Sequence, residues 1–266
     1  MKGYNHMNTN NGFLEIEKAK KKFGGLTAVS NFSLHLKKGE LKGLIGPNGA
    51  GKTTVFNLIT GFYKPNDGKI LFKGVDITNE SPDMRVNRGI GRTFQEIRMQ
   101  KCTTVIDEIK VGFFRHIKYK YNFFNVIFQT SNYISEEKKI IEESIEIMDL
   151  LDISNLANQI AEDLPFGLQR KVSIARALAL KPELLLLDEP ASGLNPNETR
   201  ELIELIYKIR KKFNLTIIII EHDMSVIMTI CNDIPAMNEG NIIGSGTPKE
   251  IQNNKRVIES YLGGIS

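Results

Sequence analysis

Two short apolar segments in the C-terminal half of the chain have the pattern of buried strands. Residues 184–187 are all leucine and are followed by Asp188-Glu189-Pro190, and the apolar residues 216–220 are followed by Glu221-His222-Asp223. Between these segments, residues 198–213 carry apolar side chains at helical spacing, namely Leu202, Ile206, Ile209 and Phe213. Unbroken apolar strands are typical of parallel sheets covered on both faces, so the pattern predicts a strand–helix–strand unit of parallel α/β type.

A glycine-rich loop nearer the N-terminus is also flanked by a strand and a helix. Residues 32–36 alternate as in a strand, residues 37–40 favour a turn, and residues 41–45 are apolar apart from Lys42. The loop follows directly, with the sequence Gly46, Pro47, Asn48, Gly49, Ala50, Gly51, Lys52 and Thr53. Residues 53–58 then begin a helical pattern. Strand, loop and helix in this order are the context that a phosphate-binding loop requires.

The middle of the chain, residues 97–163, differs from the flanking segments because it contains no buried-strand pattern. Residues 135–152 are helical in pattern, and we expect Ile141, Ile145 and Met148 to form their buried side. The sequence therefore predicts an inserted helical subdomain at residues 97–163. It lies between the two parts of a nucleotide-binding core, residues 13–96 and 164–266, with a polar N-terminal tail at residues 1–12.

Composition excludes several classes of protein. The 266 residues are 41% hydrophobic and 25% charged, as in ordinary globular proteins, and a formal charge of +4 is too small for a dedicated nucleic-acid-binding protein. Cys102 and Cys231 belong to no metal or redox motif. The N-terminus lacks a secretory signal, and the longest apolar runs fall short of the roughly 20 residues that span a bilayer. We therefore expect a cytoplasmic protein whose membrane association comes through partners.

The chemistry of the loop points to a nucleoside triphosphate. Glycines at 46, 49 and 51 allow the backbone N–H groups to turn toward phosphate oxygens, and the following helix adds its positive N-terminal end. Lys52 would contact the β- and γ-phosphates. The Thr53 hydroxyl would be a ligand of Mg²⁺, which keeps several waters and takes few protein ligands. The alternative is an ordinary glycine-rich turn before a helix.

Polar residues at the ends of the two buried strands supply candidates for hydrolysis. Asp188 would hold Mg²⁺, and Glu189 would act as general base or orient the attacking water. His222 would reach the same crevice and bind the γ-phosphate, although a lone histidine is more often a satisfied polar residue. Gln95 has the reach to contact Mg²⁺ or the water, although a glutamine at a strand end is commonly a surface amide.

Taken together, these motifs resemble the ATP-binding cassette (ABC) transporter ATPases. The loop at residues 46–53, Gln95, residues 164–178, Asp188-Glu189-Pro190, Ser192-Gly193-Leu194-Asn195 and His222 occur in the order of that family. The resemblance covers nearly the whole chain. It implies a P-loop NTPase (RecA-like) core with a mainly parallel sheet, an N-terminal antiparallel β-subdomain and an inserted helical subdomain.

Residues 54–63 and 191–196 further resemble the branched-chain amino acid importer ATPases of the LivG type. This resemblance implies a second cassette, in a homo- or heterodimer, with ATP between the loop of one chain and the signature segment of the other. It also implies two transmembrane permease subunits, an extracytoplasmic substrate-binding protein and a place at the cytoplasmic face of the membrane. It adds as ATP-binding residues Phe23, which would stack on adenine, Thr54, Pro165, Phe166, Gly167, Leu168 and Asn195.

The chain departs from the family pattern in the signature segment, where Pro165, Phe166 and Leu168 stand in place of serine, glycine and glutamine. Pro165 has neither a hydroxyl nor an N–H, so the serine contact to the γ-phosphate cannot be made there. Asn195 stands where many cassettes have aspartate. Pro235 interrupts a segment that is a strand in the family, and it predicts an edge or an irregular strand there.

Other functions remain as alternatives at this point. A P-loop GTPase or small-molecule kinase would share the loop, but the guanine-recognition and switch motifs are missing from the sequence. A cassette acting on ribosomes or DNA would carry a second cassette or a long coiled coil. Import of urea or amides and export of lipopolysaccharide are the rival transport functions. The aromatic and basic residues 113–128 suggest a membrane or coupling role, or a helix packing within its own subdomain.

Overall fold

The computed structural model describes residues 12–116 and 131–262. Apart from Gly12, the expected polar tail lies outside the described residues, and so does most of the aromatic and basic segment 113–128. Among the described residues, no helix combines the length and the apolar character needed to cross a membrane.

The N-terminal part forms an antiparallel sheet in the order β2-β1-β4-β5. Its strands are β1 (Leu14–Phe23), β2 (Leu26–Leu36), β4 (Asp67–Phe72) and β5 (Val75–Asp76). In the second half of β2, Phe32, Leu34 and Leu36 are buried and alternate with exposed residues, which is the period of a strand with one buried face. The predicted strand at residues 32–36 is thus the end of a longer one.

A second sheet is parallel, in the order β3-β8-β7-β6. Its strands are β3 (Leu41–Leu44), β6 (Ile90–Arg92), β7 (Leu184–Asp188) and β8 (Thr216–Ile220). Every residue of β7 and β8 is buried, because alternate side chains enter two separate cores. Leu185, Leu187, Ile217 and Ile219 pack with the helices on one face, and Leu184, Leu186, Ile218 and Ile220 pack with the antiparallel sheet and α1 (Lys52–Thr60) on the other. The predicted parallel α/β unit is confirmed.

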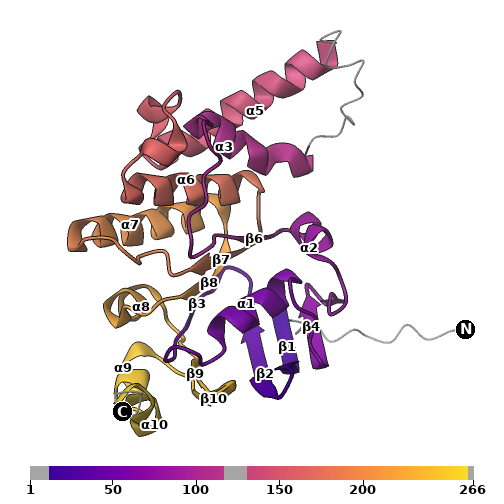
Figure 1. Ribbon diagram of the computed structural model, residues 1–266, viewed down its shortest axis with the longest axis vertical. Helices are drawn as coiled ribbons and strands as arrows, with labels where there is room; N and C mark the ends of the chain where they lie inside the picture. The colour runs from indigo at the N-terminus through magenta and orange to yellow at the C-terminus, as the bar shows by residue number, and fades with distance from the viewer. Residues whose placement is uncertain (1–11, 117–130, 263–266) are drawn as a thin grey trace, which may run out of the picture.

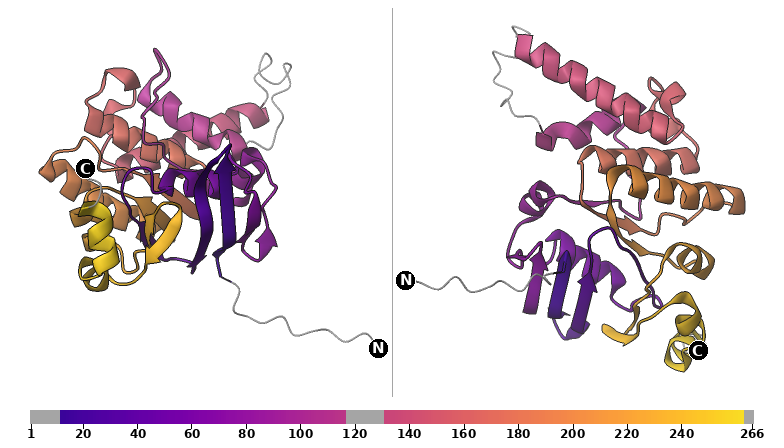
Figure 2. Two further views of the ribbon diagram at one scale, coloured as in Figure 1. Left: turned by 60° about the horizontal axis from the view of Figure 1, so that its bottom comes forward. Right: turned by 180° about the vertical axis from the view of Figure 1, so that it is seen from behind.

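Several of the helices on the first face form a layer at one end of the molecule, and the antiparallel sheet lies toward the other end (Figure 1). The view from behind shows the same order (Figure 2). The layer consists of α3 (Val105–Lys110), the 3₁₀ helix η1 (Val111–His116), α5 (Ser131–Leu150), the 3₁₀ helices η2 (Ser154–Leu156) and η3 (Ala161–Asp163), and α6 (Phe166–Ala179). Helices α3 and α5 pack against α6. Phe113, the first residue of the aromatic and basic segment, is buried within this layer.

The buried side of α5 differs from the expected one. Ile141 and Ile145 are 37% and 41% exposed, whereas Met148 is buried as predicted. The buried line contains Ile140, Ser144, Ile147, Met148 and Leu151. Ser144 makes this line difficult to recognise in the sequence because serine is polar. Its side chain can be buried because the hydroxyl donates a hydrogen bond to the carbonyl of Ile140 at 2.7 Å. The prediction for Ile141 and Ile145 was therefore wrong.

Helix α7 (Pro196–Phe213) links β7 to β8 as predicted. Leu202, Ile206 and Ile209 of the expected stripe are buried, but Phe213 is 39% exposed. The correction at Phe213 has a simple cause, since the helix ends at this residue and Asn214 turns the chain with a φ of 49°.

The remaining elements are α2 (Pro82–Arg88), α8 (Met224–Ile230), β9 (Ala236–Asn238), β10 (Asn241–Gly244), α9 (Pro248–Gln252) and α10 (Lys255–Leu262). The segment around Pro235 follows the free edge of β3, where the N–H of Gly43 donates to Asp233 and that of Ile45 donates to Pro235. Pro235 therefore accepts a ladder hydrogen bond without having to donate one, which confirms the predicted edge or irregular strand.

Candidate nucleotide-binding and hydrolysis site

The parallel register brings the predicted site residues to one edge of the sheet. Ile220 at the end of β8 pairs with Leu44 of β3 on one side and with Asp188 of β7 on the other. The phosphate loop, Glu189 and His222 therefore leave the sheet at the same level. On the other side of β7, Arg92 of β6 pairs with Leu186, so the chain carries Gln95 to this edge as well. Ligands of open α/β sheets bind at this carboxyl edge.

The glycines of the loop are required by its backbone. Gly46, Gly49 and Gly51 have φ values of 152°, 79° and 102°. A Cβ on Gly46 would lie 2.3 Å from the carbonyl oxygen of Met237, and one on Gly51 would lie 2.4 Å from that of Ala28. The loop thus curls tightly against two neighbouring segments and leads into the N-terminus of α1, where unpaired N–H groups favour an anion.

Lys52, the first residue of α1, lies inside this loop. Its ammonium donates to the carbonyl oxygens of Gly46 at 2.6 Å and Pro47 at 3.0 Å, and the residue is 5% exposed. Burial lowers the pKa of Lys52, and the negative charges of Glu189 and Asp188 oppose that shift. The lysine and the two carboxylates thus act on one another across the edge of the sheet.

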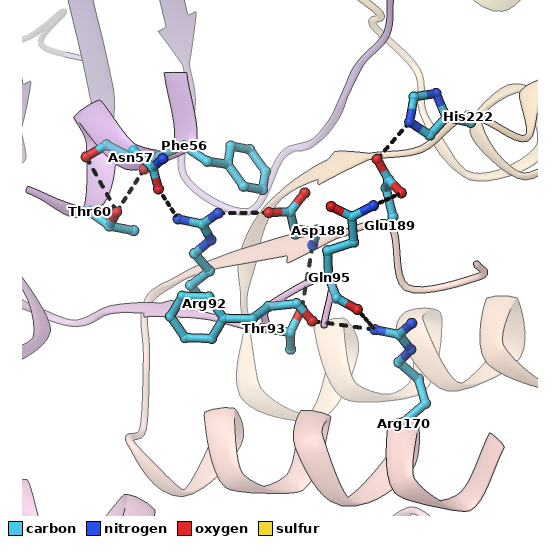
Figure 3. Close-up of polar contacts among 11 residues, drawn as sticks. Phe56, Asn57, Thr60, Arg92, Thr93, Gln95, Arg170, Asp188, Glu189 and His222 are labelled. Atoms are coloured by element: carbon cyan, nitrogen blue, oxygen red, sulfur yellow. Dashed lines mark hydrogen bonds and ion pairs between the residues drawn. The ribbon is translucent and has the colours of Figure 1, made fainter. Parts of the chain in front are cut away.

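Glu189 is held by two of the other predicted residues. Gln95 donates its amide N–H to Oε2 of Glu189 at 2.7 Å, and Nε2 of His222 lies 2.6 Å from Oε1 (Figure 3). The backbone of Glu189 has a φ of 48°, a conformation that costs a non-glycine residue energy and often marks functional sites. The structure therefore brings Glu189, Gln95 and His222 into one constellation.

Asp188 is oriented by a residue that the motifs did not single out. Nη2 of Arg92 donates to Oδ2 of Asp188 at 2.7 Å, and Nη1 of Arg92 donates to Oδ1 of Asn57 in α1 at 2.6 Å (Figure 3). Burial raises the pKa of Asp188, and Arg92 counteracts this effect. The sequence contained a signal, since Arg92 immediately precedes Thr93-Phe94-Gln95, but it lies 96 positions from its partner.

The site fits a magnesium ion. Oδ1 of Asp188 is buried and has no hydrogen-bond partner within the part of the chain that the structure describes. Such an oxygen would be costly unless a ligand pairs with it. Thr53 lies in the first turn of α1 with its side chain exposed, and Gln95 uses its amide nitrogen for Glu189, which leaves the amide oxygen. Carboxylate, hydroxyl and amide oxygens are the ligands that Mg²⁺ prefers.

The signature segment contacts a different part of the molecule. Pro165 precedes α6, and a Cβ on Gly167 would lie 2.9 Å from Oε1 of Glu198. The exposed Phe166 packs beside Gly193. Asn195 caps α7, with its side chain accepting from the N–H groups of Asn197 and Glu198. Residues 165–168 and Asn195 therefore gather around the start of α7, and the interactions described for them do not involve the phosphate loop.

The two remaining expected ATP contacts are Thr54 and Phe23. Thr54 is half-buried in the first turn of α1. Phe23, at the end of β1, is 41% exposed and meets Tyr63 edge to face at 5.0 Å between ring centroids. The ammonium of Lys21 lies 5.2 Å from the centre of the Phe23 ring. Phe23 is thus an exposed aromatic side chain that contacts Tyr63 and Lys21.

The fold and the site together define a nucleoside triphosphatase of the P-loop class. A glycine-rich loop leads from β3 into α1, and β7 of the same sheet ends at Asp188, with Glu189 directly after it.

Comparison with known proteins identifies the family. Residues 29–192 match the ABC transporter model, and residues 241–265 match that of the branched-chain amino acid ATP-binding cassette transporter. The chain belongs to the ABC transporter family, and it is one of the family's ATPases. The resemblance inferred from the motifs is thus confirmed.

The similar proteins include ATP-binding proteins of branched-chain amino acid transport. The chain is 42% identical over 242 residues to the high-affinity branched-chain amino acid transport ATP-binding protein LivG of Escherichia coli, covering 91% of this chain and 94% of LivG. It is 39% identical over 250 residues to BraF of Pseudomonas aeruginosa, covering 94% and 97%. Among solved structures, the ADP conformation of an ATP-binding cassette of an ABC transporter superposes with a TM-score of 0.82 at 31% identity, covering 94% and 98%.

Proposed function

We propose that this chain hydrolyses ATP to drive the import of branched-chain amino acids. The proposal for hydrolysis rests on Glu189, which follows Asp188 in the chain and is contacted by Gln95 and His222. The charges of Glu189 and Asp188 also act on Lys52. The names of LivG and BraF, and the match of residues 241–265, support the choice of substrate. No observation on this chain favours urea, amides or lipopolysaccharide.

In the proposed reaction, the carboxylate of Glu189 accepts a proton from the attacking water. The water oxygen forms a bond to the γ-phosphorus in line with the bond that breaks, and the leaving oxygen stays with ADP. Gln95 and His222 orient Glu189 through the two contacts described above, and His222 would bind the γ-phosphate. Lys52 and the N–H groups of residues 48–54 stabilise negative charge on the phosphates. Mg²⁺, held through Asp188, Thr53 and Gln95, would neutralise charge on the β- and γ-phosphates when bound.

The signature segment of this chain would serve a partner cassette. Residues 165–168 gather at the start of α7, so the phosphate loop of this chain would face the signature segment of a second chain across a dimer. Phe166, Gly167, Leu168 and Asn195 would then approach the partner's nucleotide, while Pro165 would offer it no hydroxyl. Two permease subunits, an extracytoplasmic binding protein and a position at the cytoplasmic face of the membrane complete the proposal.

Substitution of Glu189 tests the proposed hydrolysis. We expect Glu189→Gln, in the assembled transporter, to reduce ATP turnover about 100-fold or more, because a general base contributes 10²–10⁴ to the rate. Glu142→Gln on the exposed side of α5 is the matched control and should leave turnover unchanged. Equal turnover of Glu189→Gln and the control would refute the assigned role.

Uptake by membrane vesicles tests the proposed substrate. Vesicles containing the chain with its permeases and binding protein should accumulate labelled leucine, isoleucine or valine when ATP is enclosed. Accumulation of urea without these amino acids, or movement of lipopolysaccharide, would exclude the amino acid proposal and leave the ATPase intact.

A further inference from the structure

Glu221 is a buried carboxylate that the proposed chemistry does not use. It immediately follows β8, is 2% exposed, and directs its two oxygens at different loops. Oε1 accepts the N–H of Ala191 at 2.5 Å, and Oε2 accepts the N–H of His222 at 3.2 Å. Both partners are main-chain groups, so the contacts fix the course of the backbone.

Glu221 connects two loops, one of which begins at Glu189 while the other contains His222, and these two residues contact each other through their side chains. Ala191 belongs to the turn that begins at Glu189, in which the N–H of Ser192 donates to the carbonyl of Glu189 at 3.2 Å. The other loop carries His222, whose imidazole touches the Glu189 carboxylate. An ionised carboxylate only accepts hydrogen bonds, so it satisfies both N–H groups at once. A glutamine offers one acceptor oxygen and would turn an NH₂ group toward the other N–H.

Arg170 supplies a buried positive charge near Glu221. It lies on α6, four residues after Phe166, and is 1% exposed. Its guanidinium reaches three main-chain oxygens at long range, those of Phe94 and Gln95 at 3.4 Å and that of Ser192 at 3.5 Å. Among the described residues, its buried Nε has no hydrogen-bond partner.

Electrostatics connects the two residues. Burial lowers the pKa of Arg170, and Glu221 is the strongest of the carboxylates that oppose this shift, ahead of Glu189 and Asp188. Burial raises the pKa of Glu221 to about 7, with Glu189 adding to the increase and Arg170 opposing it. The guanidinium also lies 5.2 Å from the centre of the Phe166 ring, in the signature segment. Arg170 thus links the start of α6 to the loops on either side of Glu189.

We propose that Glu221 is a positioning residue that sets Glu189 and His222 against each other for hydrolysis, and that Arg170 ties this arrangement to the signature helix α6. The inference rests on the proposed roles of Glu189 and His222 and is independent of the transported substrate. It follows that a displacement of α6, which begins in the signature segment, alters the geometry around the general base of the same chain.

The first test compares Glu221→Gln with the wild type in the assembled transporter, using ATP and Mg²⁺. We expect kcat to fall about 10- to 100-fold, because small misplacements of reacting groups have effects of this size, while KM for ATP changes less than about twofold. Glu80→Gln, which removes a carboxylate that binds Arg88 away from the site, is the control and should retain kcat. A change in KM alone, or a kcat equal to that of the control, would refute the positioning role.

The pH profile separates positioning from a general structural defect. The charged groups that act on Glu221 are Glu189 and Arg170, and both remain in the variant. Because the wild-type carboxyl also becomes neutral below its pKa of about 7, the ratio of wild-type to variant kcat should shrink as pH falls from 8.5 to 6. A ratio that does not depend on pH would overturn the proposal.

Variants of Arg170 test the link to α6. Arg170→Gln should lower kcat to a similar degree, Arg170→Lys should recover part of it, and the double variant Glu221→Gln/Arg170→Gln should be no slower than the slower single variant. Fully multiplicative losses would show that the two residues act separately. If Glu189→Gln leaves turnover intact, the proposed function fails. If Glu189→Gln abolishes turnover while Glu221→Gln does not affect it, only this inference fails.

Discussion

Neutralising Glu221 should stabilise the protein while it impairs hydrolysis. The carboxyl is 2% exposed, and burial raises its pKa from 4.5 to about 7. This increase corresponds to about 3 kcal/mol of differential interaction between the protonated and ionised forms. A buried glutamine never carries this charge, so Glu221→Gln avoids the desolvation of an ionised group at neutral pH.

The sign of the pH dependence follows from linkage. Because the pKa of the folded state lies above that of the unfolded state, the folded protein binds the proton more tightly. The contribution of proton binding at Glu221 to the free energy of unfolding is therefore complete below pH 4.5, and it is lost as pH rises to about 7. The free energy of unfolding of the variant, relative to wild type, should increase by about 2 kcal/mol between pH 5.5 and 8.5, which corresponds to roughly 4–8 °C in Tm.

Urea unfolding of the full chain at pH 5.5 and 8.5, followed by circular dichroism, measures this difference. All other titrating groups are shared by the two proteins, so their effects cancel in the comparison. A stability difference that is the same at both pH values would show that Glu221 does not titrate in this window. A variant that is less stable than wild type at pH 8.5 would show that the two main-chain hydrogen bonds outweigh the charge, and the reasoning would be wrong.

Three further predictions address the loop, the metal ligand and the start of α7. Gly46→Ala should weaken binding of a fluorescent ATP analogue at least about tenfold, because φ is 152° and the new Cβ would lie 2.3 Å from the Met237 carbonyl; unchanged binding would show that the loop tolerates a side chain. Arg92→Met leaves Asp188 buried without its partner, so it should lower the free energy of unfolding by about 3 kcal/mol and raise the Mg²⁺ concentration needed for half-maximal nucleotide binding. A urea midpoint and a Mg²⁺ titration equal to those of the wild type would contradict this. Asn195→Ala removes the cap of α7 and should cost about 1 kcal/mol in urea unfolding, whereas Asn195→Ser should cost less; equal losses would argue against capping.

Local pattern was sufficient to predict much of the fold. The unbroken apolar runs at 184–187 and 216–220 are β7 and β8, and the glycine-rich loop lies between β3 and α1 as expected. On α5 the spacing of apolar residues did not predict the buried side. The buried line of residues contains the polar Ser144, so in the sequence it is no more apolar than the exposed line through Ile141 and Ile145. A serine whose hydroxyl bonds a main-chain carbonyl of its own helix cannot be told from an exposed serine by the sequence pattern.

The candidate site was predicted only in part. Gln95, Glu189 and His222 were chosen as separate residues, and the structure joins them in one hydrogen-bonded group. Arg92 and Glu221 were not predicted, although Arg92 lies three positions before Gln95 and Glu221 immediately precedes His222, because a motif does not show which charged residue is buried.

The sequence by itself determined the strand–helix–strand unit of β7, α7 and β8, the phosphate loop, and the carboxylates at the end of β7, because backbone preference and hydrophobic period act over a few neighbouring residues. Only the tertiary structure decided which charges meet. Arg92 and Asp188 are 96 positions apart, and Glu221 and Ala191 are 30 positions apart. Such pairs exist because the parallel register places strand ends side by side, and because a buried charge or N–H group is stable only when a partner reaches it.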